Sequence, residues 1–131
     1  MNESDFLIDL DHIISIESNW KEKAYNKKSG ARGLGQITQI ALQDYNQMNP
    51  GNKKKVEDLY DPQTNMMISS WMLNERIPSL LRHYKKPVTE DNILWAYNAG
   101  IGRVVDNVMP LETKDYIRKY KARKTAVSNG E

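Results

Sequence analysis

Residues 89–100 read TEDNILWAYNAG, and this stretch decides the fold class. Thr is a common cap at helix N-termini, and Gly often stands just past a helix C-terminus. Between Thr89 and Gly100, the run Ile93-Leu94-Trp95-Ala96-Tyr97 is apolar on every side of a helix. A helix without a polar face is buried all round. The pattern therefore predicts a helix, ending near Gly100, at the centre of a helical fold.

Other helical patterns flank this central segment. We expect them over residues 4–18 with Ser4 or Asp5 as N-cap, from Thr38 to about Asn46, from Asp61-Pro62 onward, and from about Thr113 to Arg123. Asp followed by Pro is a strong helix start, whereas Pro78 is expected to kink or break the helix begun there. The sequence predicts an all-α domain of about six short helices, with at most a small β-hairpin among the glycines of residues 30–35.

Length and composition fit one compact domain. The chain has 131 residues, 39% of them hydrophobic, which suits one core and leaves no length for a second. We expect a single domain over residues 1–131, with residues 126–131 as a frayed tail. Cysteine is absent, and His12 and His83 show no ligand spacing, so we expect neither a disulfide nor a metal site.

The charge balance favours an acidic partner only mildly. Lys and Arg total 19 against 17 Asp and Glu, a net charge of +2. We interpret the runs Lys53–Lys55 and Arg118–Lys124 as solvated charges and expect no nucleic-acid partner. No apolar stretch approaches the ~20 residues of a membrane span, and the polar residues 1–5 do not resemble a secretory signal.

Glu17 is a charge in an unexpected place. At about 100° per residue, Phe6, Leu10, Ile13 and Glu17 fall within about 60° of one helix face. A carboxylate on an apolar stripe must end the helix at solvent, pair with a cation or be partly desolvated. Desolvation favours the neutral form, and an acid that keeps its proton can donate it to a leaving oxygen. Glu17 is therefore a candidate proton donor for glycoside cleavage.

The usual second carboxylate of a glycosidase is not evident. Asp61 is better explained as a helix cap, and the other acids considered are interpreted as solvated loop or helix-start residues: Glu22, Asp44 and Asp91. Glu75, one turn beyond Trp71, is kept in reserve.

Several separated motifs together resemble the catalytic domain of the soluble lytic transglycosylase (SLT) family. The resemblance covers most of the chain, and the order and spacing of the motifs are specific. The matching motifs are Glu17-Ser18, the loop Gly30-Ala31-Arg32-Gly33-Leu34-Gly35-Gln36-Ile37, Asp61-Pro62-x-x-Asn65, Ala96-Tyr97-Asn98-Ala99-Gly100, and Pro110, Glu112-Thr113 and Tyr116-Ile117. This family has a lysozyme-like fold related to goose-type lysozyme, so the resemblance implies that fold here.

The chain departs from the family pattern at two positions. Gly35 stands where Met is usual, and Thr38 follows the loop where the family commonly continues toward Pro. Neither change removes a reacting group. The flexible thioether of methionine fills apolar gaps, and Gly35 lacks it. We therefore expect the change to affect substrate preference more than activity.

The resemblance implies a reaction that needs one carboxyl group. Family members cut the β-1,4 bond between N-acetylmuramic acid and N-acetylglucosamine without water and leave a 1,6-anhydromuramyl end. By this carry-over Glu17 is the single acid and base, the substrate's acetamido oxygen assists, and no cofactor is required.

Further motif residues are expected to bind the glycan strand. Neutral amides and hydroxyls suit acetamido and hydroxyl groups, and glycines let backbone approach a substrate closely. The predicted substrate-binding residues are Ser18, Gln36, Tyr97, Asn98 and Tyr116, with Gly33 and Gly35 allowing the approach. Trp20, Trp71 and Trp95 are not assigned as sugar platforms, because large aromatics at such spacings more often build core.

Two alternatives remain open. If water reaches C1, the chain is a lysozyme-type muramidase. It could also be a non-catalytic glycan-binding module of a phage tail or secretion machine. We expect a monomer that acts on peptidoglycan at the cell wall. That location implies a removed export signal, a larger parent chain or delivery by another route.

Overall fold

The computed structural model describes residues 8–128, which contain helices and no β-strand. Two isolated bridges, Tyr25 with Arg32 and Arg32 with Ile37, are the β-pairing within this range. The all-α prediction is therefore confirmed. Contacts divide the described residues into two compact units, one formed by residues 8–12 together with residues 71–128, the other by Ile13–Ser70.

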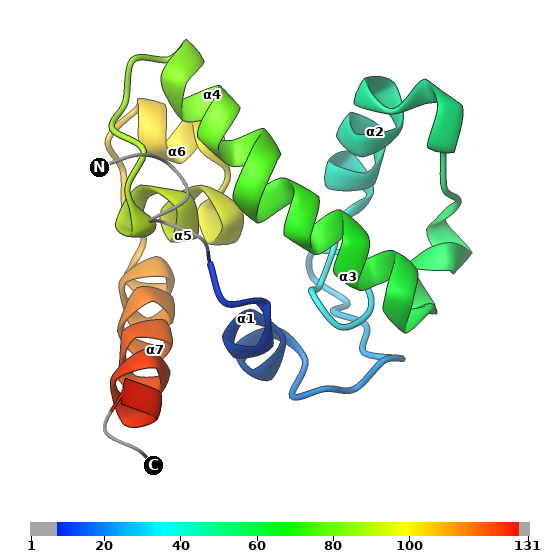
Figure 1. Cartoon of the computed structure of the whole chain (residues 1–131), viewed down its shortest axis with the longest axis horizontal. Coiled ribbons are helices and arrows are strands. Elements are labelled where there is room, and N and C mark those ends of the chain that lie inside the picture. Colours follow the sequence, from blue (N-terminus) through cyan, green and yellow to red (C-terminus); the bar gives the residue numbers. More distant parts are fainter. Residues whose placement is uncertain (1–7, 129–131) are drawn as a thin grey trace. The chain divides into compact units, whose positions relative to one another are not determined.

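The α-helices are α1 (Leu10–Glu17), α2 (Gln39–Met48), α3 (Pro62–Trp71), α4 (Ile77–His83), α5 (Glu90–Ala99), α6 (Ile101–Val105) and α7 (Leu111–Ser128). Two 3-10 helices, η2 (Pro50–Asn52) and η3 (Val56–Tyr60), and the π turn η4 (Met72–Arg76) complete the helical structure of residues 8–128. Helices α3 and α4 follow one another through η4 without a break (Figure 1) and so count as one helical segment. Residues 8–128 then hold six α-helical segments, as expected from the sequence.

Helix α5 is the centre of the unit that contains residues 71–128. Thr89 caps it by accepting from the amide of Asn92 at 3.1 Å, and Gly100 ends it with a φ of +93°. It packs against α4, α6 and α7 (Figure 1). Its residues Ile93–Ala96 are buried, whereas Tyr97 is half-buried. The prediction of a central, buried helix is confirmed.

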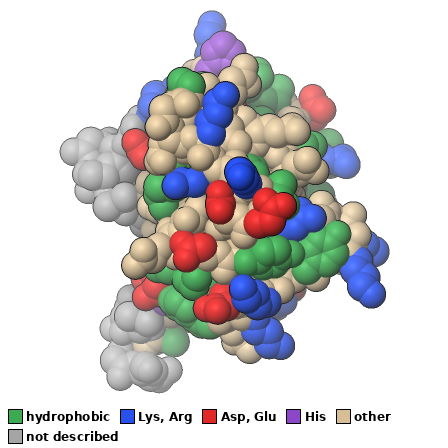
Figure 2. Space-filling model, turned by 90° about the vertical axis from the view of Figure 1, so that its right-hand side faces the viewer, with side chains coloured by type: hydrophobic (Ala, Val, Ile, Leu, Met, Phe, Trp, Pro, Cys, Tyr) green, Lys and Arg blue, Asp and Glu red, His purple; other side chains and the backbone are tan. Residues whose placement is uncertain are grey.

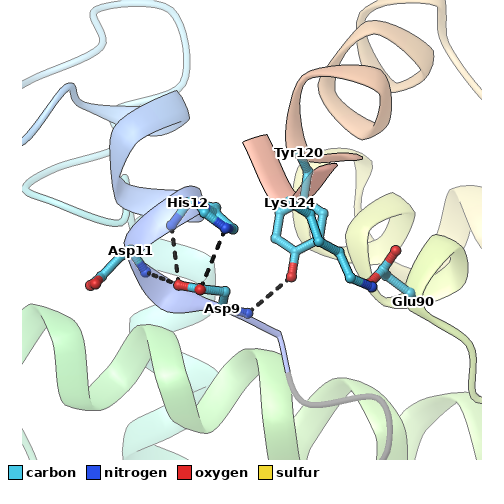
Figure 3. A network of polar contacts seen from close by, with 6 residues as sticks. All are labelled: Asp9, Asp11, His12, Glu90, Tyr120 and Lys124. Carbon is cyan, nitrogen blue, oxygen red and sulfur yellow. Dashed lines mark hydrogen bonds and ion pairs between the residues drawn. The ribbon is translucent and has the colours of Figure 1, made fainter. Parts of the chain in front are cut away.

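The start of α1 differs from the expected position. Ile8 and Asp9 are not helical, because the Asp9 carboxylate caps the helix by accepting from the amide of Asp11 at 2.9 Å (Figure 3). The Asp9 amide donates to the Tyr120 hydroxyl of α7 at 3.0 Å, which directs the chain away from a helical path. A helix that includes Ile8 and Asp9 was therefore a wrong prediction. The proposed caps Ser4 and Asp5, and Phe6 of the apolar stripe, lie outside the described residues.

Pro78 neither breaks nor ends its helix. Proline lacks an amide hydrogen and its ring crowds the carbonyl one turn earlier. The turn before it widens into η4, where the Ile77 amide bonds to the Met72 carbonyl, and α4 then continues with Pro78 buried. A π turn is a recognised way to accommodate an irregularity in a helix. The helix was expected to kink or break at Pro78: the break is wrong, and the irregularity takes the form of the π turn η4 directly before it.

The Ile13–Ser70 unit holds the glycine-rich loop, which lies between α1 and α2 in the sequence. Thr38 caps α2 by accepting from the Ala41 amide at 3.2 Å, as expected. Asp61 caps α3 in the same way through Thr64 at 2.9 Å. The buried apolar residues of this unit are Ile13, Ile14, Ala31, Leu34, Ile37, Leu42, Tyr45, Leu59 and Ile68. Loop residues from Ala31 to Ile37 thus form part of the core.

The last helix is longer than expected and runs from Leu111 to Ser128. Residues 126–128 of the expected tail are helical, and 129–131 lie outside the described residues. Within residues 8–128, no helix has the length and apolar character needed to cross a membrane. On the face drawn in Figure 2, Lys and Arg side chains lie among Asp and Glu side chains, and hydrophobic groups reach the surface.

Candidate active site

Glu17 is the last residue of α1, and its side chain is half-buried. The helix closes behind it: the Asn19 amide bonds to the Ser15 carbonyl at 3.2 Å, and Asn19 has a φ of +53°. A left-handed residue just past the last turn is a common helix ending, and Asn tolerates it. This turn holds the Glu17 carboxyl group at the end of a rigid element.

Ser18 uses its hydroxyl inside the same helix end. The side chain is 7% exposed, and its Oγ donates to the Ile14 carbonyl at 3.2 Å. This bond helps satisfy a carbonyl of the last turn. The hydroxyl keeps its lone pairs as acceptors.

Residues 25–37 form a compact loop held by its own backbone. Arg32 and Ile37 exchange two amide hydrogen bonds of 3.0 Å each, and Gly33 donates to the Ala24 carbonyl at 2.8 Å. Gly30 has a φ of +74° at the turn that returns to Asn26. The loop is therefore preorganised by local hydrogen bonds.

Gln36 supports this loop with its amide nitrogen. The Nε2 group donates to the carbonyls of Gly33 at 3.0 Å and Ala24 at 3.3 Å, and the residue has a φ of +54°. Both amide hydrogens are thereby directed to the loop backbone. The carbonyl oxygen of the same amide can still accept a hydrogen bond from a ligand.

Asn65 of α3 joins the loop to the helix. Its side chain is fully buried, and its Oδ1 accepts from the Gly35 amide at 2.7 Å and from the Ser69 hydroxyl at 3.2 Å. Its Nδ2 donates to the carbonyls of Leu59 at 2.8 Å and Arg32 at 3.0 Å. All the hydrogen-bonding capacity of one amide is used, which fixes both its orientation and the loop position.

Gly33 and Gly35 serve this packing, so we interpret them differently from the sequence prediction. A Cβ on Gly33, whose φ is +79°, would lie 2.1 Å from the Leu59 carbonyl oxygen. A Cβ on Gly35 would lie 2.0 Å from Ser69 Oγ. These glycines bring the loop against α3 and η3. The close approach that they permit is to the protein's own backbone and side chains.

Asn98 is held in the other unit by the start of α7. The Thr113 hydroxyl, which is fully buried, donates to Asn98 Oδ1 at 2.8 Å. This bond orients the amide so that its NH₂ group points away from Thr113. Tyr97 on α5 is half-buried and Tyr116 on α7 is buried, with 5% of its surface exposed. The buried faces of α5 and α7 therefore fix the positions of the helices that carry these two tyrosines.

The acids considered as second carboxylates have other surroundings. Asp61 is the α3 cap, which confirms its interpretation. Glu22 and Glu75 are exposed, and Asp91 is exposed and pairs with Lys121 at 2.7 Å. Within residues 8–128, no group of three or more His, Asp or Glu side chains is placed to hold a metal ion.

The family model of the transglycosylase SLT domain matches residues 9–120. The chain belongs to this family. Comparisons with curated proteins and with solved structures gave no match. The SLT assignment confirms the resemblance seen in the motifs, and it supports a lytic transglycosylase-like function on peptidoglycan, with action outside the cytoplasm.

In this SLT domain, two positioning residues had no role assigned from the sequence. Asn65 and Thr113 are both in the quoted motifs, yet neither was predicted to act on the site. Their type gave the available signal, since a polar residue at a buried motif position requires a partner. The partners, Gly35 and Asn98, are 30 and 15 residues away in sequence.

Proposed function

We propose that this SLT domain cleaves the β-1,4 bond between N-acetylmuramic acid and N-acetylglucosamine without water, with Glu17 as its single acid and base. The family match over residues 9–120 carries the proposal, because it includes Glu17 and every other motif residue. The half-buried position of Glu17 at the end of α1 supports a proton-transfer role.

The reaction proceeds in two balanced steps. Glu17 donates its proton to the glycosidic oxygen, the C1–O bond breaks, and the acetamido oxygen of the muramic acid stabilises C1. The C6 hydroxyl oxygen then bonds to C1, and Glu17 takes the hydroxyl proton. The products are a free 4-hydroxyl on N-acetylglucosamine and a 1,6-anhydro ring, and Glu17 is protonated again. No cofactor is consumed.

We assign glycan binding to Ser18, Gln36, Tyr97, Asn98 and Tyr116. The NH₂ group of Asn98 and the remaining acceptor of Gln36 suit acetamido groups. Tyrosine offers a hydroxyl and a flat apolar ring, both of which suit a sugar. Because the family match extends through both compact units, we propose that they function as one catalytic domain, a monomer that works at the cell wall.

Digestion of purified peptidoglycan tests the proposal. Mass spectrometry should find products one water lighter than hydrolysed muropeptides. Glu17→Gln should abolish turnover while binding to insoluble peptidoglycan persists, and Glu57→Gln, at an exposed acid on η3, should cleave like the parent protein.

Each other outcome identifies a different function. Products with reducing ends would show a muramidase, in which water attacks C1. Binding without turnover by the parent protein, on wall preparations of different composition, would show a glycan-binding module. Full activity of Glu17→Gln would remove Glu17 from the mechanism.

A further inference from the structure

Trp20 is placed differently from the other tryptophans. Its side chain is 50% exposed, whereas Trp95 is 9% exposed and donates from Nε1 to the Val108 carbonyl at 2.9 Å. Trp71 is half-buried. The expectation that tryptophans build the core is therefore confirmed for Trp95 and wrong for Trp20.

The backbone at Trp20 is strained. Its φ is +64°, directly after Asn19 at +53°, and the Lys21 amide closes the turn by bonding to the Ser18 carbonyl at 3.1 Å. A large aromatic residue is rarely found in this left-handed region, where Gly or Asn fits better. Within residues 8–128, Trp20 forms no hydrogen bond through its side chain and no ring contact. A smaller residue such as Gly or Asn would therefore form this turn with less backbone strain.

Strain at an exposed aromatic indicates a functional requirement for the ring. Trp20 follows Glu17 by three residues, so the chain between them spans at most about 11 Å. The indole is therefore close enough to Glu17 to contact a strand whose cleaved bond lies at Glu17. A flat apolar face with a polar edge suits a sugar ring, which has an apolar face and hydroxyls at its rim.

The surrounding loop is complementary to an acidic strand. Residues 19–32 carry five cations, Lys21, Lys23, Lys27, Lys28 and Arg32, against one acid, Glu22. The resulting local charge of +4 exceeds the +2 of the whole chain. The Arg32 guanidinium lies 5.0 Å from the ring centroid of Tyr25, which is itself 50% exposed. Peptidoglycan carries carboxylates, and such a loop attracts them.

We propose that Trp20 stacks on a sugar ring of the glycan strand and forms a binding subsite beside Glu17. This inference rests on the proposed function for the identity of the ligand. Its readout is binding, which is independent of cleavage.

Binding is measured in a Glu17→Gln background, with purified glycan strands as the probe. Adding Trp20→Gly should weaken binding about tenfold, because the stacking face is lost. Trp20→Phe should restore most of the affinity. Tyr84→Ala removes another exposed aromatic, 44% exposed after α4, and should leave binding unchanged.

If Trp20 had only a structural role, replacing it would lower the melting temperature and leave binding unchanged. The proposed subsite predicts the reverse: because glycine fits a φ of +64°, Trp20→Gly should be as stable as the parent protein or more stable in thermal melts. With Glu17 present, the same change should raise KM with little effect on kcat. A lower melting temperature together with unchanged affinity would overturn the proposal.

Fluorescence gives a second readout on the unmodified ring. Glycan strands should shift the emission of Trp20 to shorter wavelength and protect it from iodide quenching, and Trp20→Phe should remove both effects. If the parent protein binds in this way but does not cleave, the proposed reaction is wrong and the subsite stands. If it cleaves and Trp20→Gly binds normally, the subsite is wrong and the reaction stands.

Discussion

The Gly35 amide donates to Asn65 Oδ1 over 2.7 Å, and this bond joins the glycine-rich loop to α3. It is one of four bonds that use the whole Asn65 amide, with partners on the loop, on η3 and within α3. Asn65, a buried residue of α3, therefore fixes the position of the glycine-rich loop. Variants of Asn65 and of its neighbours test how far the loop depends on it.

Asn65→Ala should destabilise the protein by about 3 kcal/mol, because it leaves buried groups of Gly35, Leu59 and Arg32 without their partner. Urea denaturation followed by circular dichroism measures the change. Asn92→Ala is the control. Its Nδ2 donates once, to the Pro87 carbonyl at 2.9 Å in an exposed setting, and its loss should cost under about 1 kcal/mol. Equal effects of the two changes would contradict the role of Asn65.

Gly35→Ala should cost about 1–3 kcal/mol, because the new Cβ meets Ser69 Oγ at 2.0 Å. Ser69→Gly should cost about 1 kcal/mol from helix propensity. The double variant should be more stable than the sum of the two single changes predicts, by about 1 kcal/mol, since the removed hydroxymethyl group makes room for the methyl. Gly51→Ala, with nothing within 4 Å of its Cβ, is the matched control and should change little. Simple additivity would contradict the contact.

Thr113→Val should cost about 1–2 kcal/mol and leave Asn98 free to rotate, because the 2.8 Å bond to Asn98 Oδ1 is lost in a buried setting. Under the proposed function KM for peptidoglycan should rise as well. Thr125→Val at an exposed position of α7 should change neither quantity. A Thr113→Val enzyme with unchanged KM would mean that the orientation of Asn98 does not matter to binding.

Glu17→Gln should leave the free energy of unfolding unchanged or raise it by up to about 1 kcal/mol. An acid that is half-buried in the last turn of α1 meets both a desolvation cost and the negative end of the helix dipole. Thermal melts of both proteins at pH 7 measure the change, with Glu57→Gln as the exposed control. A loss of several kcal/mol would identify Glu17 as a structural ion-pair member.

Asp61 should give the stability of the protein a specific acid dependence. Both the amide and the hydroxyl of Thr64 donate to the carboxylate. These bonds, the amide bond more than the hydroxyl bond, lower the pKa of Asp61 below its ordinary 3.8. With a lower pKa in the folded state, the charged cap stabilises the fold above about pH 4, and this contribution is lost as pH falls through the folded pKa. The stability gap between the parent and Asp61→Ala should therefore narrow below about pH 4.

Urea denaturation from pH 7 to pH 2 measures this gap. Asp61→Asn is the matched variant, because Asn also caps helices but does not titrate. It should stay close to the parent at pH 7. A gap between the parent and Asp61→Ala that is constant across the range would exclude the titrating cap.

Local patterns predicted the elements whose signals are local. Thr38, Asp61 and Thr89 cap the expected helices because each bond of a cap joins residues three apart. A partner distant in sequence decided the failed prediction at the start of α1, and a local change of helix geometry decided the one at Pro78. Helix α1 starts late because Asp9 bonds to Tyr120, and Pro78 is accommodated because the preceding turn widens into η4.

By itself, the sequence determined the helical class, the buried α5 and the family, because apolar periodicity, caps and motif spacing are all written along the chain. Tertiary structure alone decided that Gly33 and Gly35 pack against Asn65 and Ser69, that Thr113 orients Asn98, and that Trp20 is exposed. The physical reason is that burial and hydrogen-bond partners depend on which distant residues meet, and that information appears only when the chain has folded.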